Sequence, residues 1–258
     1  MSTSQLPMLP AKHYTLPSTP KAIWLIAQRG ALEALRNRST LLIGVLFSVL
    51  FPVYLETAIL HQVATGPQHQ QILGVTMVSL LLVVGLFNTS AASSIAAGVF
   101  AGEKEKGNLT PLLATPVSNV AIFGGKILSA VLPALVFALI AEIVYLGAVV
   151  RDLGLASLEL MPIFLVLATV ILIPALAIFS ATIVSIVSSR VRTYTAASTV
   201  GGLVMLPIWF GALALTQAVL HWGGVTLLLA IAVTLLVDAI LIIVGATTWR
   251  REEVLAKL

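Results

Sequence analysis

The chain contains no cysteine and carries few charges. The absence of cysteine excludes disulfides, thiolate metal sites and a cysteine nucleophile anywhere in its 258 residues. Only 9% of the residues are charged, compared with roughly 25% in an ordinary soluble domain. So few charges cannot cover the surface of a soluble protein of this length. We therefore expect most of the surface to face lipid.

The usual nucleotide-binding, metal-binding and catalytic signatures are also absent from the sequence. The Gly125-Lys126 pair is followed by Ile127, and Val120 stands where a phosphate-binding loop requires its first glycine. The histidines are not spaced as paired metal ligands, and there is no Gly-x-Ser-x-Gly, kinase or zinc-protease motif. The chain is therefore expected not to be an enzyme by itself and to hold no metal or cofactor.

Long apolar runs make up most of the sequence, of which 59% is hydrophobic. Runs such as Leu41–Leu60 and Val225–Ala246 approach the roughly 20 residues with which a helix crosses a hydrocarbon core about 30 Å thick. They are apolar on every side, whereas the strands of a membrane β-barrel alternate apolar and polar residues. The sequence thus predicts an all-α membrane protein with six transmembrane helices. These spans are predicted at residues 41–60, 73–100, 120–149, 161–188, 196–217 and 225–248.

The distribution of lysine and arginine predicts the orientation of the chain. With six spans, thirteen of the fourteen basic residues fall on the side that holds both termini, and only Arg151 falls on the other side. Because cytoplasmic loops carry the excess of Lys and Arg, we expect both termini in the cytoplasm and the chain in the cell inner (plasma) membrane. The net charge of +4 has the same origin, since the basic residues lie at helix ends. No nucleic-acid partner is therefore expected.

Three segments lie outside the predicted six-span membrane domain, residues 41–248. Residues 1–20 are polar and proline-bearing and lack the apolar core of a cleavable signal peptide, so we expect a disordered cytoplasmic tail. Residues 249–258 are expected to form a second cytoplasmic tail. Residues 21–38 separate into two faces at 100° per residue, which predicts an amphipathic helix on the lipid surface; a soluble helix packed on a partner domain is the alternative. The predicted apolar face holds Ile23, Trp24, Ala27, Ala31, Ala34 and Leu35, and the polar face Arg29, Glu33, Arg36 and Asn37.

The most informative stretch follows the second predicted span. Four alternating charges, Glu103–Lys106, are followed by a segment in which Thr110 can cap a one-turn helix at Pro111–Ala114. Pro116 discourages helix at the residue before it, and Ser118 can cap the third span. The sequence therefore predicts a short cytoplasmic elbow with a charged base.

The elbow has apolar residues that a partner protein could bind. Leu109, Leu112 and Leu113 would lie on one side of it and suit insertion into a groove. An ordinary charged loop next to a membrane can have the same composition, so the residue pattern alone leaves both interpretations open.

This stretch resembles the cytoplasmic signature of ABC-2-type permeases, the membrane subunits of ATP-binding-cassette exporters. That signature joins an acidic-basic-acidic cluster to Gly-Thr-Leu-Glu, a Leu-Leu pair and a Thr-Pro-Val-Ser ending. Asn108 and Thr110 depart from it, and Thr110 replaces the usual acidic residue. The matching residues are Glu103, Lys104, Glu105, Lys106, Gly107, Leu109, Leu112, Leu113, Ala114, Thr115, Pro116, Val117 and Ser118.

The resemblance implies that the elbow is a coupling helix seated in a groove of a separate ATPase subunit, which binds ATP and Mg²⁺. It also implies a homodimer of permeases with two ATPase subunits. The second and fifth spans would line the substrate path, with Asn88 and Trp209 as candidate lining residues. The implied direction is export, and the substrate is left open. The ATPase-coupling residues implied are Glu103, Lys104, Glu105, Lys106, Gly107, Leu109, Leu112, Leu113, Thr115 and Pro116.

Two acidic residues lie well inside predicted spans, Glu142 in the third and Asp238 in the sixth, whereas Glu56 lies nearer the external end of the first. A charge that faces lipid at such a depth costs roughly 2.5–3.5 kcal/mol or more. Each side chain is therefore expected to face the bundle or water, or to stay protonated. One interpretation places both residues on the substrate path. The other makes them buried polar ties between helices, which we favour for Asp238.

Two other functions stay open on the sequence alone. A polytopic membrane enzyme or scaffold would use Glu142 or Asp238 in chemistry or assembly, without an ATPase. A permease-like component would keep the ATPase but serve cofactor or haem delivery or maturation. A neighbouring gene for a cassette ATPase would argue against the first alternative, and a periplasmic carrier protein would favour the second.

Overall fold

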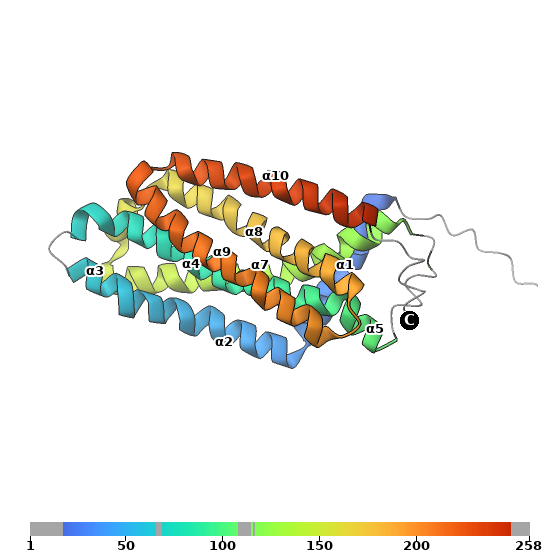
Figure 1. Cartoon of the computed structure of the whole chain (residues 1–258). Helices are drawn as coiled ribbons and strands as arrows, with labels where there is room; N and C mark the ends of the chain where they lie inside the picture. Colours follow the sequence, from blue (N-terminus) through green and yellow to red (C-terminus); the bar gives the residue numbers. More distant parts are fainter. Residues whose placement is uncertain (1–17, 66–68, 108–114, 116, 249–258) are drawn as a thin grey trace, which may run out of the picture.

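The computed structural model is a bundle of long helices that run side by side along one axis (Figure 1). It describes residues 18–65, 69–107, 115 and 117–248, and all regular structure within these residues is helical. Six helical segments among them are long and apolar enough to cross a membrane. This confirms the predicted all-α, six-span fold.

The six spans cover the predicted ranges to within a few residues at each end. The first joins α2 (Arg38–Leu55), η1 (Glu56–Leu60) and α3 (His61–Thr65), and the second joins α4 (His69–Ala97), η2 (Gly98–Gly102) and α5 (Glu103–Glu105). The others are α7 (Asn119–Leu153), α8 (Ile163–Arg190), α9 (Tyr194–Trp222) and α10 (Val225–Thr248), with η3 (Leu155–Leu160) between α7 and α8. Since α7 has 35 residues, it is roughly 52 Å long and extends beyond a hydrocarbon core about 30 Å thick.

Local sequence explains where several helices begin and end. Ser118 caps α7 as predicted, since its hydroxyl accepts a hydrogen bond from the Ala121 amide at 3.2 Å. Thr193 caps α9 through the Ala196 amide at 3.3 Å. Gly154 ends α7 with a φ of 82°, a backbone conformation that a glycine adopts without a steric penalty.

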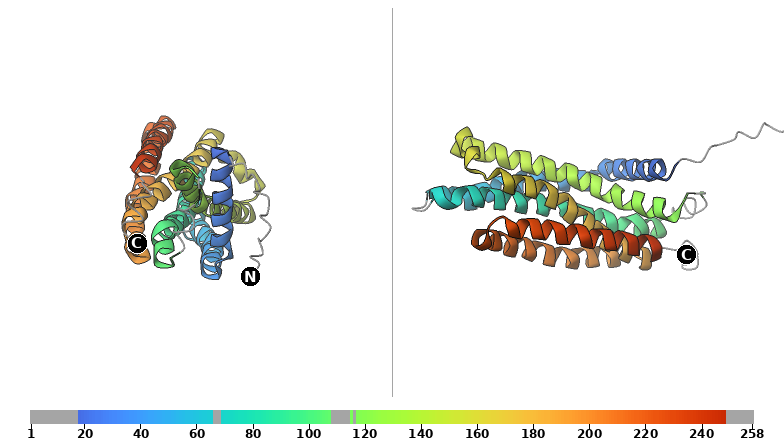
Figure 2. Two further views of the ribbon diagram at one scale, coloured as in Figure 1. Left: turned by 90° about the vertical axis from the view of Figure 1, so that its right-hand side faces the viewer. Right: turned by 90° about the horizontal axis from the view of Figure 1, so that it is seen from above.

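The centre of the bundle is formed by α4, α7 and α8, which pack against one another. On one side α2 packs against α7 and α4, and on the other α9 and α10 pack against α8. The two views of Figure 2 show α10 at the outside, and most of its large apolar side chains are exposed. The buried apolar side chains therefore lie between the central helices, while the outer helices present apolar surface to lipid.

Two spans contain a π-helical segment near one end. One is η1, in the first span, and the other is η2, which directly precedes the charged residues Glu103–Lys106. A π-helical turn inserts an extra residue into an α-helix, and such turns are frequent at functional sites. At η2, Ser188 of α8 accepts from the Ala101 amide at 2.9 Å and donates to the Ala97 carbonyl oxygen at 2.7 Å. The altered turn is thus held by hydrogen bonds to a neighbouring span.

Helix α1 (Thr19–Arg36) lies across the outside of the bundle, at the end that carries α5 (Figure 2). It begins two residues before the predicted boundary at residue 21, with Pro20 in its first turn, and Asn37 separates it from α2. It packs on the first half of α7. The two helices approach closely because small residues face their neighbours: Gly30 lies against Ser129, and Gly125 lies against Ile26.

The structure shows two apolar faces on α1 where the sequence predicts one. Ala27 and Ala31 are buried against the bundle. Trp24, which the sequence groups with them, is 55% exposed, and Leu25 and Leu32 are exposed beside it. Small residues allow the closest approach of the two helices, although Ile26 also packs on α7, while Trp24, Leu25 and Leu32 face outwards. An outward row of large apolar side chains is what a helix at a lipid interface presents.

Candidate functional site

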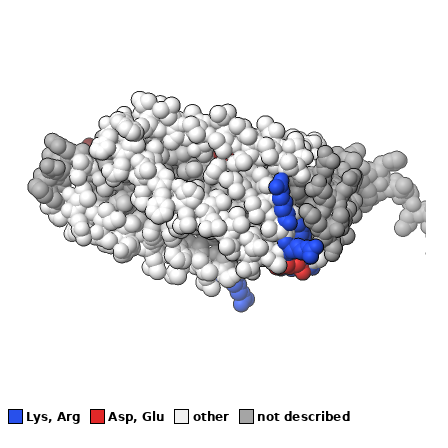
Figure 3. Space-filling model, viewed as in Figure 1, with Lys and Arg blue, Asp and Glu red and all other residues white. Residues whose placement is uncertain are grey.

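The predicted elbow begins with Glu103, Lys104, Glu105 and Lys106, which we call the stem. The stem continues the second span beyond η2 and ends at Gly107, where φ is +69°. Figure 3 shows Lys and Arg side chains gathered toward this end of the bundle, while most of the face in view is uncharged. We call it the stem end, and the opposite end the far end.

The first stem residue is tied to α7. Glu103 forms an ion pair with Lys126, whose side chain is only 7% exposed. The Lys126 ammonium also donates to the Val99 carbonyl oxygen at 3.1 Å and lies 5.8 Å from the centre of the Phe100 ring. Val99 and Phe100 belong to η2. One buried cation therefore holds the stem, the π-helical turn and α7 together. No pattern in the sequence predicts this role for Lys126.

The next two stem residues contact the turn between α8 and α9. The Lys104 ammonium donates to the carbonyl oxygens of Ser189 at 2.5 Å and Val191 at 3.3 Å. The Glu105 carboxylate accepts a hydrogen bond from the Tyr194 amide at 2.9 Å. Three residues predicted to couple to an ATPase thus contact other spans of the same chain.

The remaining predicted coupling residues are described only in part. Lys106 and Gly107 are exposed, and a Cβ placed on Gly107 would have no atom within 4 Å. Thr115 is half-buried. The apolar face of the elbow and its proline lie outside the described residues: Leu109, Leu112, Leu113 and Pro116.

Asn88, one of the two candidate path residues, sits in a polar contact between three spans. Its carboxamide oxygen lies 2.8 Å from the Ser48 hydroxyl of α2, and its nitrogen donates to the Val84 carbonyl oxygen at 3.0 Å. The same hydroxyl lies 3.0 Å from the Phe137 carbonyl oxygen of α7. Asn88 is buried, so the structure places it between α2, α4 and α7 rather than on an open wall.

Trp209, the other candidate, ends a row of aromatic rings. It stacks on Phe87 of α4 with ring centres 5.5 Å apart, and Phe87 stacks on Phe51 of α2 at 4.1 Å. The row, which also includes Phe47, joins spans that are otherwise far apart in the sequence. The indole N–H of Trp209 is buried and has no hydrogen-bond partner among the described residues. Phe87, which no sequence pattern singled out, contacts each of the other three rings.

Comparison with known proteins decides the family. A family model for the ABC-2 type transporter matches residues 21–222, from the third residue of α1 to the end of α9. The chain belongs to the ABC-2 type transporter family. No curated protein matches it. An ABC-2 chain is the membrane component of a transporter and is not itself catalytic, since this family implies nucleotide binding on a separate ATPase subunit.

The two intramembrane acids of this ABC-2 permease differ in their surroundings. The carboxylate of Glu142 reaches from α7 toward Gly85 of α4, where an added Cβ would lie 2.9 Å from it. Asp238 of α10 is 4% exposed, and neither of its carboxylate oxygens has a hydrogen-bond partner among the described residues. The interhelical tie expected for Asp238 is thus not found within the described part of this chain.

A third acid, for which the sequence predicts no role, lies toward the far end of the permease. Glu56 begins η1 and is fully buried, with one carboxylate oxygen 3.9 Å from the Arg151 guanidinium. Arg151 also pairs with its neighbour Asp152 at 2.5 Å. The single basic residue on this side is therefore held between two acids. Hydropathy and motif patterns could not show this, because residues 56 and 151 are distant in the sequence.

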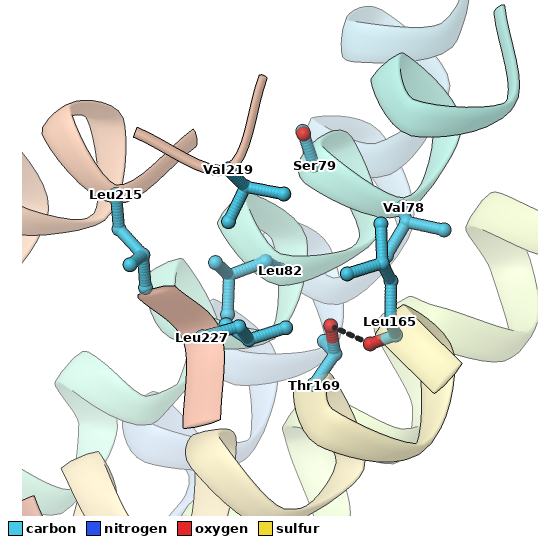
Figure 4. A pocket seen from close by; sticks show the side chains of 8 residues that line it. All are labelled: Val78, Ser79, Leu82, Leu165, Thr169, Leu215, Val219 and Leu227. Carbon is cyan, nitrogen blue, oxygen red and sulfur yellow. Dashed lines mark hydrogen bonds between the residues drawn. The ribbon is translucent and has the colours of Figure 1, made fainter. Parts of the chain in front are cut away.

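A small hollow between α4, α8, α9 and α10 has little capacity to select a ligand (Figure 4). Only about 20 Å³ of it is accessible to the centre of a water-sized sphere, whereas ligand pockets typically enclose roughly 300–1,000 Å³. The Thr169 hydroxyl on its wall is used within α8, since it donates to the Leu165 carbonyl oxygen at 2.8 Å. Apart from Ser79, the other lining residues are apolar: Val78, Leu82, Leu165, Leu215, Val219 and Leu227.

Proposed function

We propose that this chain is the permease subunit of an ABC exporter, driven by ATP hydrolysis in a separate ATPase subunit. Two copies of the chain form the membrane channel, and two ATPase copies bind it. The main support for this proposal is the set of contacts that the stem makes. The stem prolongs the second span past its π-helical turn and contacts three other spans, so a force applied there by a partner would act on most of the bundle.

The substrate path of this permease lies along α4 and α9. Both helices contribute to the aromatic row, through Phe87 and Trp209, and both have one end beside the stem. The indole N–H of Trp209, which has no hydrogen-bond partner among the described residues, is a donor that a substrate between α4 and α9 could use. Asn88 does not line the path but holds α4 against its neighbours. Glu142 contributes a carboxylate between α4 and α7.

The stem end faces the cytoplasm, and the protein resides in the cell inner (plasma) membrane. Thirteen of the fourteen basic residues lie on this side of the six-span topology. Both termini are cytoplasmic in this arrangement, and the outward apolar side chains of α1 rest in the cytoplasmic lipid surface. An ATPase can reach the stem only from that side.

The test is whether the elbow binds an ATPase. Leu112→Asp places a charge on the apolar side of the elbow, where insertion into a partner's groove would desolvate it at a cost of several kcal/mol. We expect the tagged variant to lose capture of the ATPase subunit and permease-stimulated ATP hydrolysis. The matched control is Leu155→Asp, because Leu155 is 72% exposed in the η3 connection at the far end.

Both variants should reach the membrane in wild-type amounts, because Leu112 falls between two spans predicted from the sequence and Leu155 lies in the η3 connection. Capture and stimulation of the ATPase by Leu112→Asp at the level of the Leu155→Asp control would show that the elbow is an ordinary loop. The family assignment would then stand without the coupling mechanism.

A further inference from the structure

Lys104 and Glu105 are neighbours in the stem, and they bind the two ends of one turn. Lys104 contacts the carbonyl oxygens of Ser189, in the last turn of α8, and Val191, directly after it. Glu105 contacts the amide of Tyr194, the first residue of α9. The pair therefore spans the whole connection between the fourth and fifth spans.

Each charge suits the helix end that it contacts. The last carbonyl oxygens of an α-helix have no partner within the helix and carry a partial negative charge, which favours a lysine. The first amides carry a partial positive charge and favour a carboxylate. The order Lys-Glu in the stem matches the order of the end of α8 and the start of α9, and the reverse order would oppose both helix dipoles.

The start of α9 is connected to the aromatic row through one continuous helix, which contains Pro207. Tyr194 and Trp209 lie on the same helix, fifteen residues apart, which is roughly 22 Å at 1.5 Å per residue. Trp209 stacks on Phe87 of α4. A displacement of the stem that pulls on Tyr194 would therefore move Trp209 relative to Phe87, in the part of the bundle assigned to the substrate path.

We propose that Lys104 and Glu105 are positioning residues that transmit the movement of the elbow to α9, and that they are not contacts to the ATPase itself. This inference rests on the proposed function. Glu103 acts alongside them by fixing the stem to Lys126 of α7. In this arrangement residues 103–105 contact other spans of the same chain, and the elbow that follows them binds the ATPase.

The first measurement needs no ATPase. Amide hydrogen exchange of the purified permease is compared for Glu105→Ala, Glu105→Gln and the exposed control Lys106→Ala. We expect the Tyr194 amide to exchange roughly tenfold faster in Glu105→Ala, because it loses a charged acceptor. Glu105→Gln keeps an acceptor oxygen and should restore most of the protection. Equal exchange in all three variants would show that the Glu105 contact does not hold α9, which overturns the proposal.

The second measurement follows Trp209 in the assembled complex. Trp209 is kept as the only tryptophan by replacing Trp24, Trp222 and Trp249 with Phe, and the permease is labelled with 5-fluorotryptophan and combined with the unlabelled ATPase that it captures. We expect a nonhydrolysable ATP analogue to shift the fluorine resonance in this parent protein and in Lys106→Ala. In Lys104→Met and Glu105→Ala the shift should fall below a third of the parent value, while capture of the ATPase is unchanged.

The outcomes separate the inference from the proposed function. A full shift in Lys104→Met and Glu105→Ala, or no shift in the parent complex, would show that the stem does not drive α9. Loss of ATPase capture in these variants would show that they contact the ATPase directly, which also overturns the inference. A wild-type permease that captures no ATPase contradicts the proposed function instead, and the hydrogen-exchange result then decides whether Glu105 holds α9.

Discussion

The Ser48 hydroxyl of α2 lies 2.8 Å from the side-chain oxygen of Asn88 on α4 and 3.0 Å from the carbonyl oxygen of Phe137 on α7. Both side chains are buried. The hydroxyl also lies 2.7 Å from the Gly44 carbonyl oxygen of its own helix. A hydroxyl has one proton and can donate to one oxygen at a time, so the three acceptors share it. This contact fixes α2, at the edge of the bundle, to the two central helices.

We therefore expect Ser48→Ala to destabilise the protein by about 1 kcal/mol, the usual net value of a hydrogen bond, and to leave the Asn88 oxygen without this partner. Thermal unfolding in detergent measures the effect. Ser198→Ala is the control, since the Ser198 hydroxyl bonds only to the Thr195 carbonyl oxygen of its own helix in the described structure. An equal change in the two variants would mean that the contact between spans adds nothing to stability.

Removing Glu103 and removing Lys126 should destabilise the protein by different amounts, although the two residues form one ion pair. Lys126 is 7% exposed and Glu103 is 31% exposed. Removing the carboxylate leaves a buried cation, whereas removing the lysine leaves an acid that water can reach. Glu103→Ala should therefore cost about 3 kcal/mol and Lys126→Met about 1 kcal/mol.

Melting temperatures of the two single variants and the double variant check this order. The double variant should be more stable than Glu103→Ala alone, because it contains no unpaired buried charge. A double variant that is less stable than either single variant would rule out this account of the pair.

The surroundings of Asp238 predict that its replacement by leucine does not lower the melting temperature. A polar tie between helices would predict the opposite. The Asp238 carboxyl is buried without a hydrogen-bond partner in the described chain, and burying such a group costs free energy. Asp238→Leu should therefore melt at the same temperature as wild type or higher, and Asp238→Asn should melt no lower. A melting temperature several degrees lower for Asp238→Leu would reveal a polar partner in the assembled protein. Normal stability with lost transport would assign the residue to the path.

The orientation can be tested directly because the chain has no cysteine of its own. Lys106→Cys at the stem end and Glu159→Cys at the far end introduce single thiols at exposed positions. We expect a membrane-impermeant maleimide to label residue 159 in intact cells or spheroplasts, and residue 106 only after the cells are opened. Labelling of residue 106 from outside would invert the proposed topology.

Much of the fold follows from the sequence because the governing interactions are local. The length and apolarity of each run determine a span, and the predicted boundaries differ from the helices by only a few residues. Ser118 caps α7 as predicted, since a cap depends on residues three positions apart. The stretch from Glu103 to Ser118 indicated the family, and the ABC-2 model matches the chain. Its assignment to ATPase coupling stays a prediction.

The partners of individual side chains were decided only by the tertiary structure. Nothing local relates Glu103 to Lys126, Glu105 to Tyr194 or Phe87 to Trp209, because each pair joins different spans. The same limit explains why the sequence grouped Trp24 with the buried alanines of α1: a helical wheel orders side chains by angle, but only the packed structure shows that Ala27 and Ala31 are buried and Trp24 is exposed. The sequence by itself determined which segments enter the membrane, since burial in lipid depends on the composition of each segment. How the stem is connected to the spans depends on contacts between distant residues, which exist only once the bundle has packed.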